Sequence, residues 1–170
     1  MSVRDTQRSR VYEAESVVRG IFDRADRGTG RQLELFGSRL TLPVERRFAS
    51  VQSVQAYADR VLALNWVRAR WPRSAVPVTV RARAASGAAH YEPATSTLAV
   101  PLHTGGTAWA LRELVVLHEL AHHLEPDGAD TAAHGPEFVA RYLVLVDEII
   151  GGEAAFVLRT TLAENGVRVG

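Results

Sequence analysis

The chain has 170 residues, of which 46% are hydrophobic, enough for one compact domain with a substantial core. It contains no cysteine, which excludes a disulfide framework and a cysteine-based zinc ribbon. The net charge is +1, the N-terminus lacks the apolar core of a signal peptide, and no apolar run approaches the ~20 residues that a membrane span needs. We therefore expect one domain over residues 1–170, in a cytoplasmic protein without membrane contact; the sequence predicts no oligomeric state.

Positive and negative charges are distributed unevenly along the chain. Through Arg83 there are 16 arginines against 8 acidic residues, a net of +8, and from Ala84 onward 4 against 11, a net of −7. All 20 basic residues are arginine, as a high-GC codon bias would produce. No nucleic-acid motif and no basic stripe interleaved with aromatic residues accompanies them. We expect the two halves to complement each other within one fold, with at most weak binding to nucleic acid.

The N-terminal part predicts a helix followed by a strand. Apolar residues at helical spacing predict a helix over residues 5–26, which the Gly28-Thr29-Gly30 segment ends. Residues 32–42 are predicted to form one strand, with Gly37 as a bulge or bend.

A second helix is expected to begin at a cap on Ser50 or Ser53 and to continue to about Arg70. Its apolar stripe would bury Leu64 with three other residues, and Trp71-Pro72 would end it.

A small sheet is predicted between this helix and the C-terminal half. Residues 78–81 alternate as a strand, and residues 90–92 and 97–100 flank a Pro-Ala-Thr-Ser turn that makes a hairpin. An edge strand of such a sheet can pair with an extended peptide. Tyr91 or His90 could donate a hydrogen bond to a tetrahedral oxyanion, although half-exposed strand positions explain both residues more simply.

A helix from Trp109 to Leu124, capped by Thr107, is predicted because the segment contains neither glycine nor proline. The loop from Glu125 to Ala133 should end it. Pro136 then suits the first turn of a further helix that continues to about Ile149. A last helix is expected over residues 153–164, closed by Asn165-Gly166.

The predicted Trp109–Leu124 helix carries the most specific chemical signal, because residues 118–123 are His-Glu-Leu-Ala-His-His and contain the zinc pattern H-E-x-x-H. Residues four apart share a helix face, so His118 and His122 can reach one Zn²⁺. Glu119 would lie beside the metal, where it can take a proton from zinc-bound water. The simpler alternative is a surface helix that carries two histidines by chance.

A catalytic zinc needs a third protein ligand and an open water position. His134 is the predicted third ligand, since it stands at loop distance just before the helix that Pro136 begins. Its alternative role is that of a helix-capping polar residue. Glu153 is the second choice of ligand, and Glu137 and Glu148 follow.

Three residues near the motif have less specific interpretations. His123 could tune Glu119 or touch substrate, but a surface histidine is expected. Asp127 and Asp130 could orient a ligand imidazole, although acids in such loops are more often solvated turn residues.

The block from His118 to His122, followed by His134-Gly135-Pro136-Glu137-Phe138, resembles the SprT-like zinc metallopeptidases, whose third ligand opens an H-G-x-x-F segment. Over most of residues 30–165 the chain also resembles a metallohydrolase family of high-GC actinobacteria and their phages, through residues 36–43, 89–92 and 109–114. These resemblances imply a zincin-like fold and Zn²⁺ on the three histidines. SprT-like members that act on DNA carry a zinc ribbon or a long tail, and we expect no such DNA-binding module here, since no cysteine is present for a ribbon.

Two other zincin groups fit the sequence less well. Metzincins need a glycine and a histidine where this chain has Glu125 and Gly128. The Leu120-Ala121-His122-His123-Leu124 segment resembles the ImmA/IrrE-type metallopeptidases, which use a downstream glutamate, and this resemblance is the reason for considering Glu153.

The predicted fold is α+β: a single zincin-like domain with a small mixed sheet packed on the H-E-x-x-H helix and additional helices. The predicted function is a zinc-dependent hydrolase, a metallopeptidase with Glu119 as general base and a peptide or protein as substrate. The alternative is a non-catalytic or regulatory metal-binding module that binds a protein or nucleic-acid partner. An intact Glu119 favours the enzyme, because a purely structural site needs no base.

Overall fold

A computed structural model describes residues 3–83, 87–101 and 111–170 of the chain. Contacts between residues divide the chain into two compact units. The terminal unit comprises residues 1–45 and 130–170, and the central unit comprises residues 46–129. Both units contain helices and strands, which confirms the predicted α+β class.

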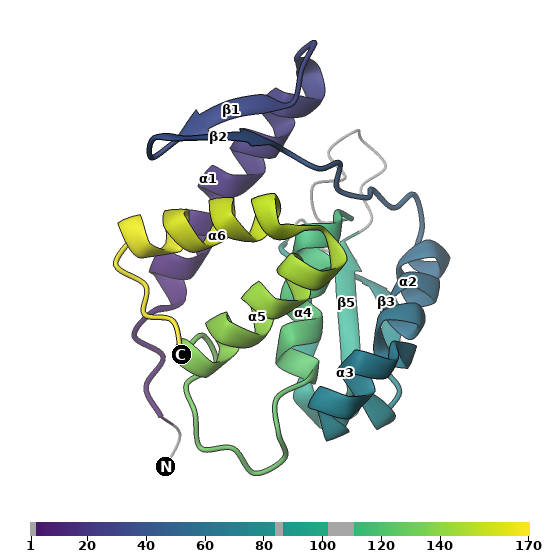
Figure 1. The fold of residues 1–170 in the computed structure, drawn as a ribbon. Coiled ribbons are helices and arrows are strands. Elements are labelled where there is room, and N and C mark those ends of the chain that lie inside the picture. The colour runs from purple at the N-terminus through teal and green to yellow at the C-terminus, as the bar shows by residue number, and fades with distance from the viewer. Residues whose placement is uncertain (1–2, 84–86, 102–110) are drawn as a thin grey trace. The chain divides into compact units, whose positions relative to one another are not determined.

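The terminal unit is built on three helices, α1 (Arg8–Arg27), α5 (Pro136–Ile149) and α6 (Gly152–Glu164), with α6 in contact with both α1 and α5 (Figure 1). Their buried stripes recur at helical spacing, as an amphipathic helix requires. The core residues they supply include Val18, Phe22, Phe138, Leu145 and Leu158. The first and last segments of the chain therefore fold together into one core.

The segment predicted as one strand is instead an antiparallel hairpin of β1 (Gln32–Leu35) and β2 (Ser38–Thr41). Phe36 and Gly37 form its turn with φ of 49° and 78°. Positive φ at both central residues is characteristic of the type I′ turn, which suits the twist of two hairpin strands. Gly37 is therefore a turn residue. The chain does bend there, but the prediction of one continuous strand was wrong, because Phe-Gly lacks the usual Asn-Gly hairpin signature.

The central unit contains a three-stranded mixed sheet in the order β3-β5-β4, with β3 (Thr79–Arg83) parallel and β4 (His90–Glu92) antiparallel to β5 (Thr97–Pro101). Every residue of β5 is buried, as expected for a central strand. The helix that carries the H-E-x-x-H motif, α4 (Glu113–His123), contacts β4. The prediction of a small mixed sheet beside the motif helix is confirmed.

The predicted second helix is broken into α2 (Val51–Ala63) and α3 (Asn65–Arg70), which the short 3₁₀ turn η1 (Pro72–Ala75) follows. Ser50 caps α2 in a capping box with Ser53, as predicted. The break is at Leu64, whose ψ of 133° is extended. Leu64 is 37% exposed, so the expectation that it is buried was wrong.

The motif helix α4 begins later than predicted. Arg112 is extended, with φ −116° and ψ 152°, and pairs with Arg47 in an antiparallel bridge. The Phe48 amide donates to the Leu111 carbonyl at 2.8 Å in the same ladder. These strand-like bonds take the backbone groups that another helical turn would need. The predicted start at Trp109 and the cap at Thr107 fall outside the described residues.

The expectation that residues 1–170 form one domain stays a prediction.

Within the part of the chain that the structure describes, none of the helices has the length and apolar character needed to cross a bilayer.

Candidate metal centre

Helix α4 presents both histidines of the motif on one face. All of its residues are buried except His122, which is half-buried. His118 and Glu119 therefore lie in the interior, and His122 lies at its boundary.

The two imidazoles of α4 lie as close as two ligands of one ion. The distance from His118 Nε2 to His122 Nε2 is 3.3 Å, and the rings are tilted by 66°. Tetrahedral Zn²⁺ with Zn–N bonds of about 2.0–2.1 Å places two ligand nitrogens about 3.3–3.4 Å apart. An N–H···N hydrogen bond between the rings would give a similar distance. The pair thus has the spacing of a metal half-site.

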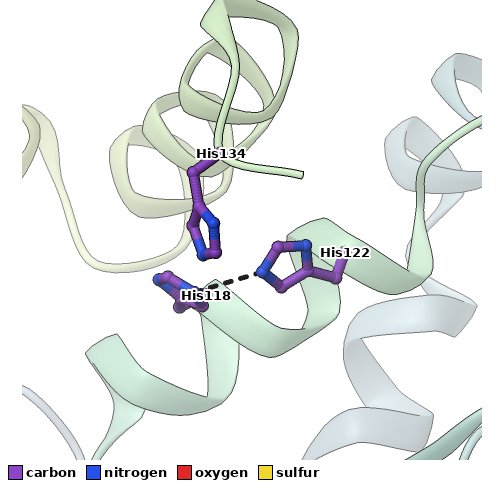
Figure 2. A group of neighbouring side chains, drawn as sticks. All are labelled: His118, His122 and His134. Atoms are coloured by element: carbon purple, nitrogen blue, oxygen red, sulfur yellow. Dashed lines mark hydrogen bonds between the residues drawn. The ribbon is translucent and has the colours of Figure 1, made fainter. Parts of the chain in front are cut away.

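His134 joins His118 and His122 in a group that can hold a metal ion (Figure 2). One ligand atom from each of the three lies within 4.8 Å of the others. Among the described residues, this is the one group of three or more histidine, cysteine or acidic side chains whose ligand atoms lie this close together. The alternative ligands Glu137, Glu148 and Glu153 are exposed and are not members.

His134 belongs to the terminal unit and is held there by residues near the N-terminus. It is 5% exposed, and its Nδ1 lies 2.7 Å from Asp5 Oδ2. A carboxylate can only accept, so His134 Nδ1–H is the donor. The rings of Tyr12 and Phe138 flank the imidazole, each at a centroid distance of 5.1 Å.

Asp127 and Asp130, the acids considered as partners of a ligand imidazole, are solvent-exposed. Asp127 pairs with Arg73 at 3.0 Å, and its side chain is 81% exposed. Asp130 is exposed as well, which agrees with the interpretation of both as turn residues. The carboxylate on a predicted ligand is Asp5, which sequence reasoning missed because 129 residues separate it from His134.

His123 is not the surface residue that was expected. It is 1% exposed, and its Nε2 donates to the Val76 carbonyl at 2.8 Å. Its Nδ1 therefore accepts from the Tyr91 hydroxyl at 2.9 Å. Burial lowers the pKa of His123 below its ordinary value and keeps the ring neutral. The expectation failed because α4 is covered on the side where β4 contacts it.

The Tyr91 hydroxyl makes its hydrogen bonds inside the central unit. Its hydroxyl gives its proton to His123 and accepts from Arg73 Nη2 at 3.4 Å. His90 is half-exposed, with contacts to Arg83 at 3.2 Å and Glu92 at 3.1 Å. These contacts favour the simpler interpretation of both as strand residues.

A buried glutamate that the sequence did not reveal anchors the first turn of α4. Glu113 is fully buried and accepts from Arg46 Nη1 at 2.7 Å, the Arg46 amide at 2.8 Å and the Tyr57 hydroxyl at 2.7 Å. Burial, together with the Glu113 carboxylate, raises the pKa of Tyr57 well above its ordinary value. This cluster fixes the start of α4 against α2, and so fixes the helix that carries the histidine pair.

No protein-family model, no curated protein and no solved structure matches the chain. The resemblances drawn above therefore rest on the quoted motifs. The structure itself supports a three-histidine group that can hold a metal ion.

Proposed function

We propose that this protein is a zinc-dependent hydrolase, with His118, His122 and His134 as metal ligands and Glu119 as general base. The observation that carries the proposal is the three-histidine group, with Glu119 next to His118 on the same helix. Motif spacing and side-chain placement agree here, which a chance H-E-x-x-H on a surface helix would not produce.

The donor set suits an open zinc site. Neutral imidazoles are good ligands for Zn²⁺, and three of them leave one position for water or substrate. A structural zinc site closes with four protein ligands. The group found among the described residues has three members, which favours a catalytic site over a structural one.

A bound Zn²⁺ would lower the pKa of a water molecule to near 7 and act as a Lewis acid. Glu119 then accepts the proton of the attacking water and delivers it to the leaving group. The interior position of Glu119 keeps bulk water from competing for its carboxylate.

Peptide amides are the substrates we favour. The motif resembles that of the SprT-like metallopeptidases, and β4 is an edge strand of the described sheet that also contacts α4. An edge strand can align an extended peptide through main-chain hydrogen bonds. In this proposal α4 carries the metal ligands His118 and His122 and the general base Glu119, and β4 binds the peptide substrate.

The test is metal analysis combined with a proteome-wide cleavage comparison of the wild type and Glu119→Gln. We expect about one zinc per chain in both proteins and cleavage in the wild type alone, since loss of a general base costs at least ~10²-fold. Glu148→Gln, at an exposed position, is the matched control and should cleave like the wild type.

If both proteins contain zinc but their cleavage patterns do not differ, the proposed hydrolase function is contradicted, and a non-catalytic metal-binding module becomes the better description. Absence of zinc from the wild type after growth in zinc-supplemented medium would contradict the metal site itself.

A further inference from the structure

His134 is held at its ring and at its backbone by the same short N-terminal segment. Asp5 accepts from the ring Nδ1 at 2.7 Å, and Gln7 Nε2 donates to the His134 carbonyl at 3.1 Å. Asp5, Gln7 and His134 all belong to the terminal unit. The segment reaches His134 across more than 120 residues of sequence.

Gln7 ties this contact to the other end of the chain. It is 2% exposed; its Nε2 also lies 3.3 Å from the Arg168 carbonyl, and its Oε1 accepts from the Arg168 amide at 2.7 Å. The Gly170 amide donates to the Pro136 carbonyl at 3.0 Å. One buried side-chain amide therefore links the N-terminal segment, the His134 loop and the C-terminal segment.

The chemistry of the Asp5 contact bears on metal binding. A carboxylate on Nδ1–H fixes the tautomer in which the lone pair is on Nε2, orients the ring and makes Nε2 more basic. Ligand histidines in metal sites commonly have such a partner. The loop acids Asp127 and Asp130 lie in the same stretch of chain as the motif but do not supply it.

We infer that Asp5 is a positioning residue for the third metal ligand, and that residues 5–7 form part of the metal centre. This inference rests on the proposed function, in which His134 binds the ion. Asp5 does not touch the ion or the substrate. It acts through His134 by presenting Nε2 in the form that a metal accepts.

Zinc affinity of Asp5 variants, measured by competition with a chromophoric chelator, is the test. We expect Asp5→Ala to bind zinc about 10–100-fold more weakly than the wild type. Asp5→Asn should lose less, because its amide oxygen still accepts from Nδ1–H but carries no charge. Asp26→Asn is the matched control, since Asp26 pairs with Arg31 at 2.6 Å in the same unit. It should keep wild-type affinity.

A second measurement uses the metal-free protein. Long-range ¹H–¹⁵N spectra should show His134 as the Nδ1–H tautomer in the wild type and in Asp5→Asn, and as a tautomer mixture in Asp5→Ala. If the wild type binds no zinc, the proposed function fails, and this spectrum alone decides whether Asp5 orients the ring.

Wild-type zinc affinity in both Asp5 variants, with only a lower unfolding temperature, would reduce Asp5 to a structural ion pair and overturn the inference. An unchanged His134 tautomer in Asp5→Ala would overturn it as well.

Discussion

The histidines of the proposed site are positioned within each unit by different physical means. In the central unit His118 and His122 are four residues apart on α4, so helix geometry places them on one face, and their Nε2 atoms lie 3.3 Å apart. In the terminal unit His134 lies in a loop, and its position depends on Asp5 and Gln7, which are 129 and 127 residues away in sequence. The first arrangement is local and the second depends on the tertiary fold.

This difference predicts which substitutions affect binding alone and which also affect folding. A half-buried histidine on a stable helix can be removed with little loss of packing. A buried histidine that holds a carboxylate and two aromatic rings cannot, because its loss leaves a cavity and an unpaired acid.

The largest expected effect is on zinc affinity. His122→Ala and His134→Ala should each weaken zinc binding by more than ~10²-fold, because each removes a ligand itself. Loss of a residue that only hydrogen-bonds to a ligand typically costs up to about 100-fold. The metal-free proteins should differ, with His134→Ala losing about 1–3 kcal/mol of unfolding free energy and His122→Ala much less. Chelator competition and urea unfolding would measure both. Equal destabilisation by the two variants would contradict the comparison between the units.

The sequence predicted the local half of the site better than the distant half. Periodicity and the absence of glycine and proline predicted the motif helix, and the H-E-x-x-H spacing predicted the close imidazole pair. Asp5 could not be found, since a lone aspartate at the start of the predicted helix carries no sign of a partner 129 residues away. The burial of His123 was missed for a similar reason, because it depends on which face of α4 meets β4.

The same limit applies to the fold. Hydrophobic patterning gave the helices and the β4–β5 hairpin. Hydrophobic patterning did not reveal the turn at Phe36-Gly37, which depends on positive φ angles, or the break at Leu64, which depends on an extended ψ angle. The late start of α4 depends on the bridge between Arg47 and Arg112, a pairing of distant residues that neither segment signals alone.

The next largest effect is on stability, through the hydrogen bonds of Glu113 at the start of α4. Tyr57→Phe removes one of the hydrogen bonds to buried Glu113 and leaves that carboxylate less satisfied, so the free energy of unfolding should fall by about 1–2 kcal/mol. Zinc affinity should stay at the wild-type value if the pair on α4 is fixed by helix geometry. A matching loss of zinc affinity would show that the pair depends on this tertiary contact.

Tyr91→Phe separates a structural role from a catalytic one. The variant loses the hydrogen bond to His123, so we expect about 1 kcal/mol less stability. Turnover of a cleaved peptide should change less than ~10-fold, since removal of an oxyanion donor costs about 10²–10³ in kcat. A drop in kcat of that larger size, at unchanged KM, would restore Tyr91 as an oxyanion donor.

Phe36→Asn tests the hairpin turn of the terminal unit. Phe36 has a φ of 49° and is 57% exposed, so its ring contributes little packing while its backbone is strained. Asparagine tolerates this conformation and forms the favoured Asn-Gly turn. We expect about 0.5–1 kcal/mol more stability in thermal unfolding. A lower melting temperature would show that the exposed ring has a packing role.

The charges of the two units bear on nucleic acid, where we expect the smallest effect. Along the sequence the net charge changes from +8 through Arg83 to −7 beyond it. The terminal unit joins basic N-terminal residues to acidic C-terminal ones, so it has 11 arginines against 13 acidic residues, a net of −2. The central unit has 9 against 6, a net of +3. The strong asymmetry of the sequence therefore largely cancels within each unit.

We accordingly predict only weak, non-specific binding to DNA. Few phosphate contacts can form on a unit with a net charge of +3, and such binding should fall steeply with salt as counterions compete. Fluorescence anisotropy with a labelled duplex at about 50 and 200 mM salt is the measurement. Arg73→Gln removes a cation that Asp127 already neutralises, so it should change the affinity little. Tight binding that persists at the higher salt would require a concentrated basic surface, and would favour a hydrolase that acts on proteins bound to DNA.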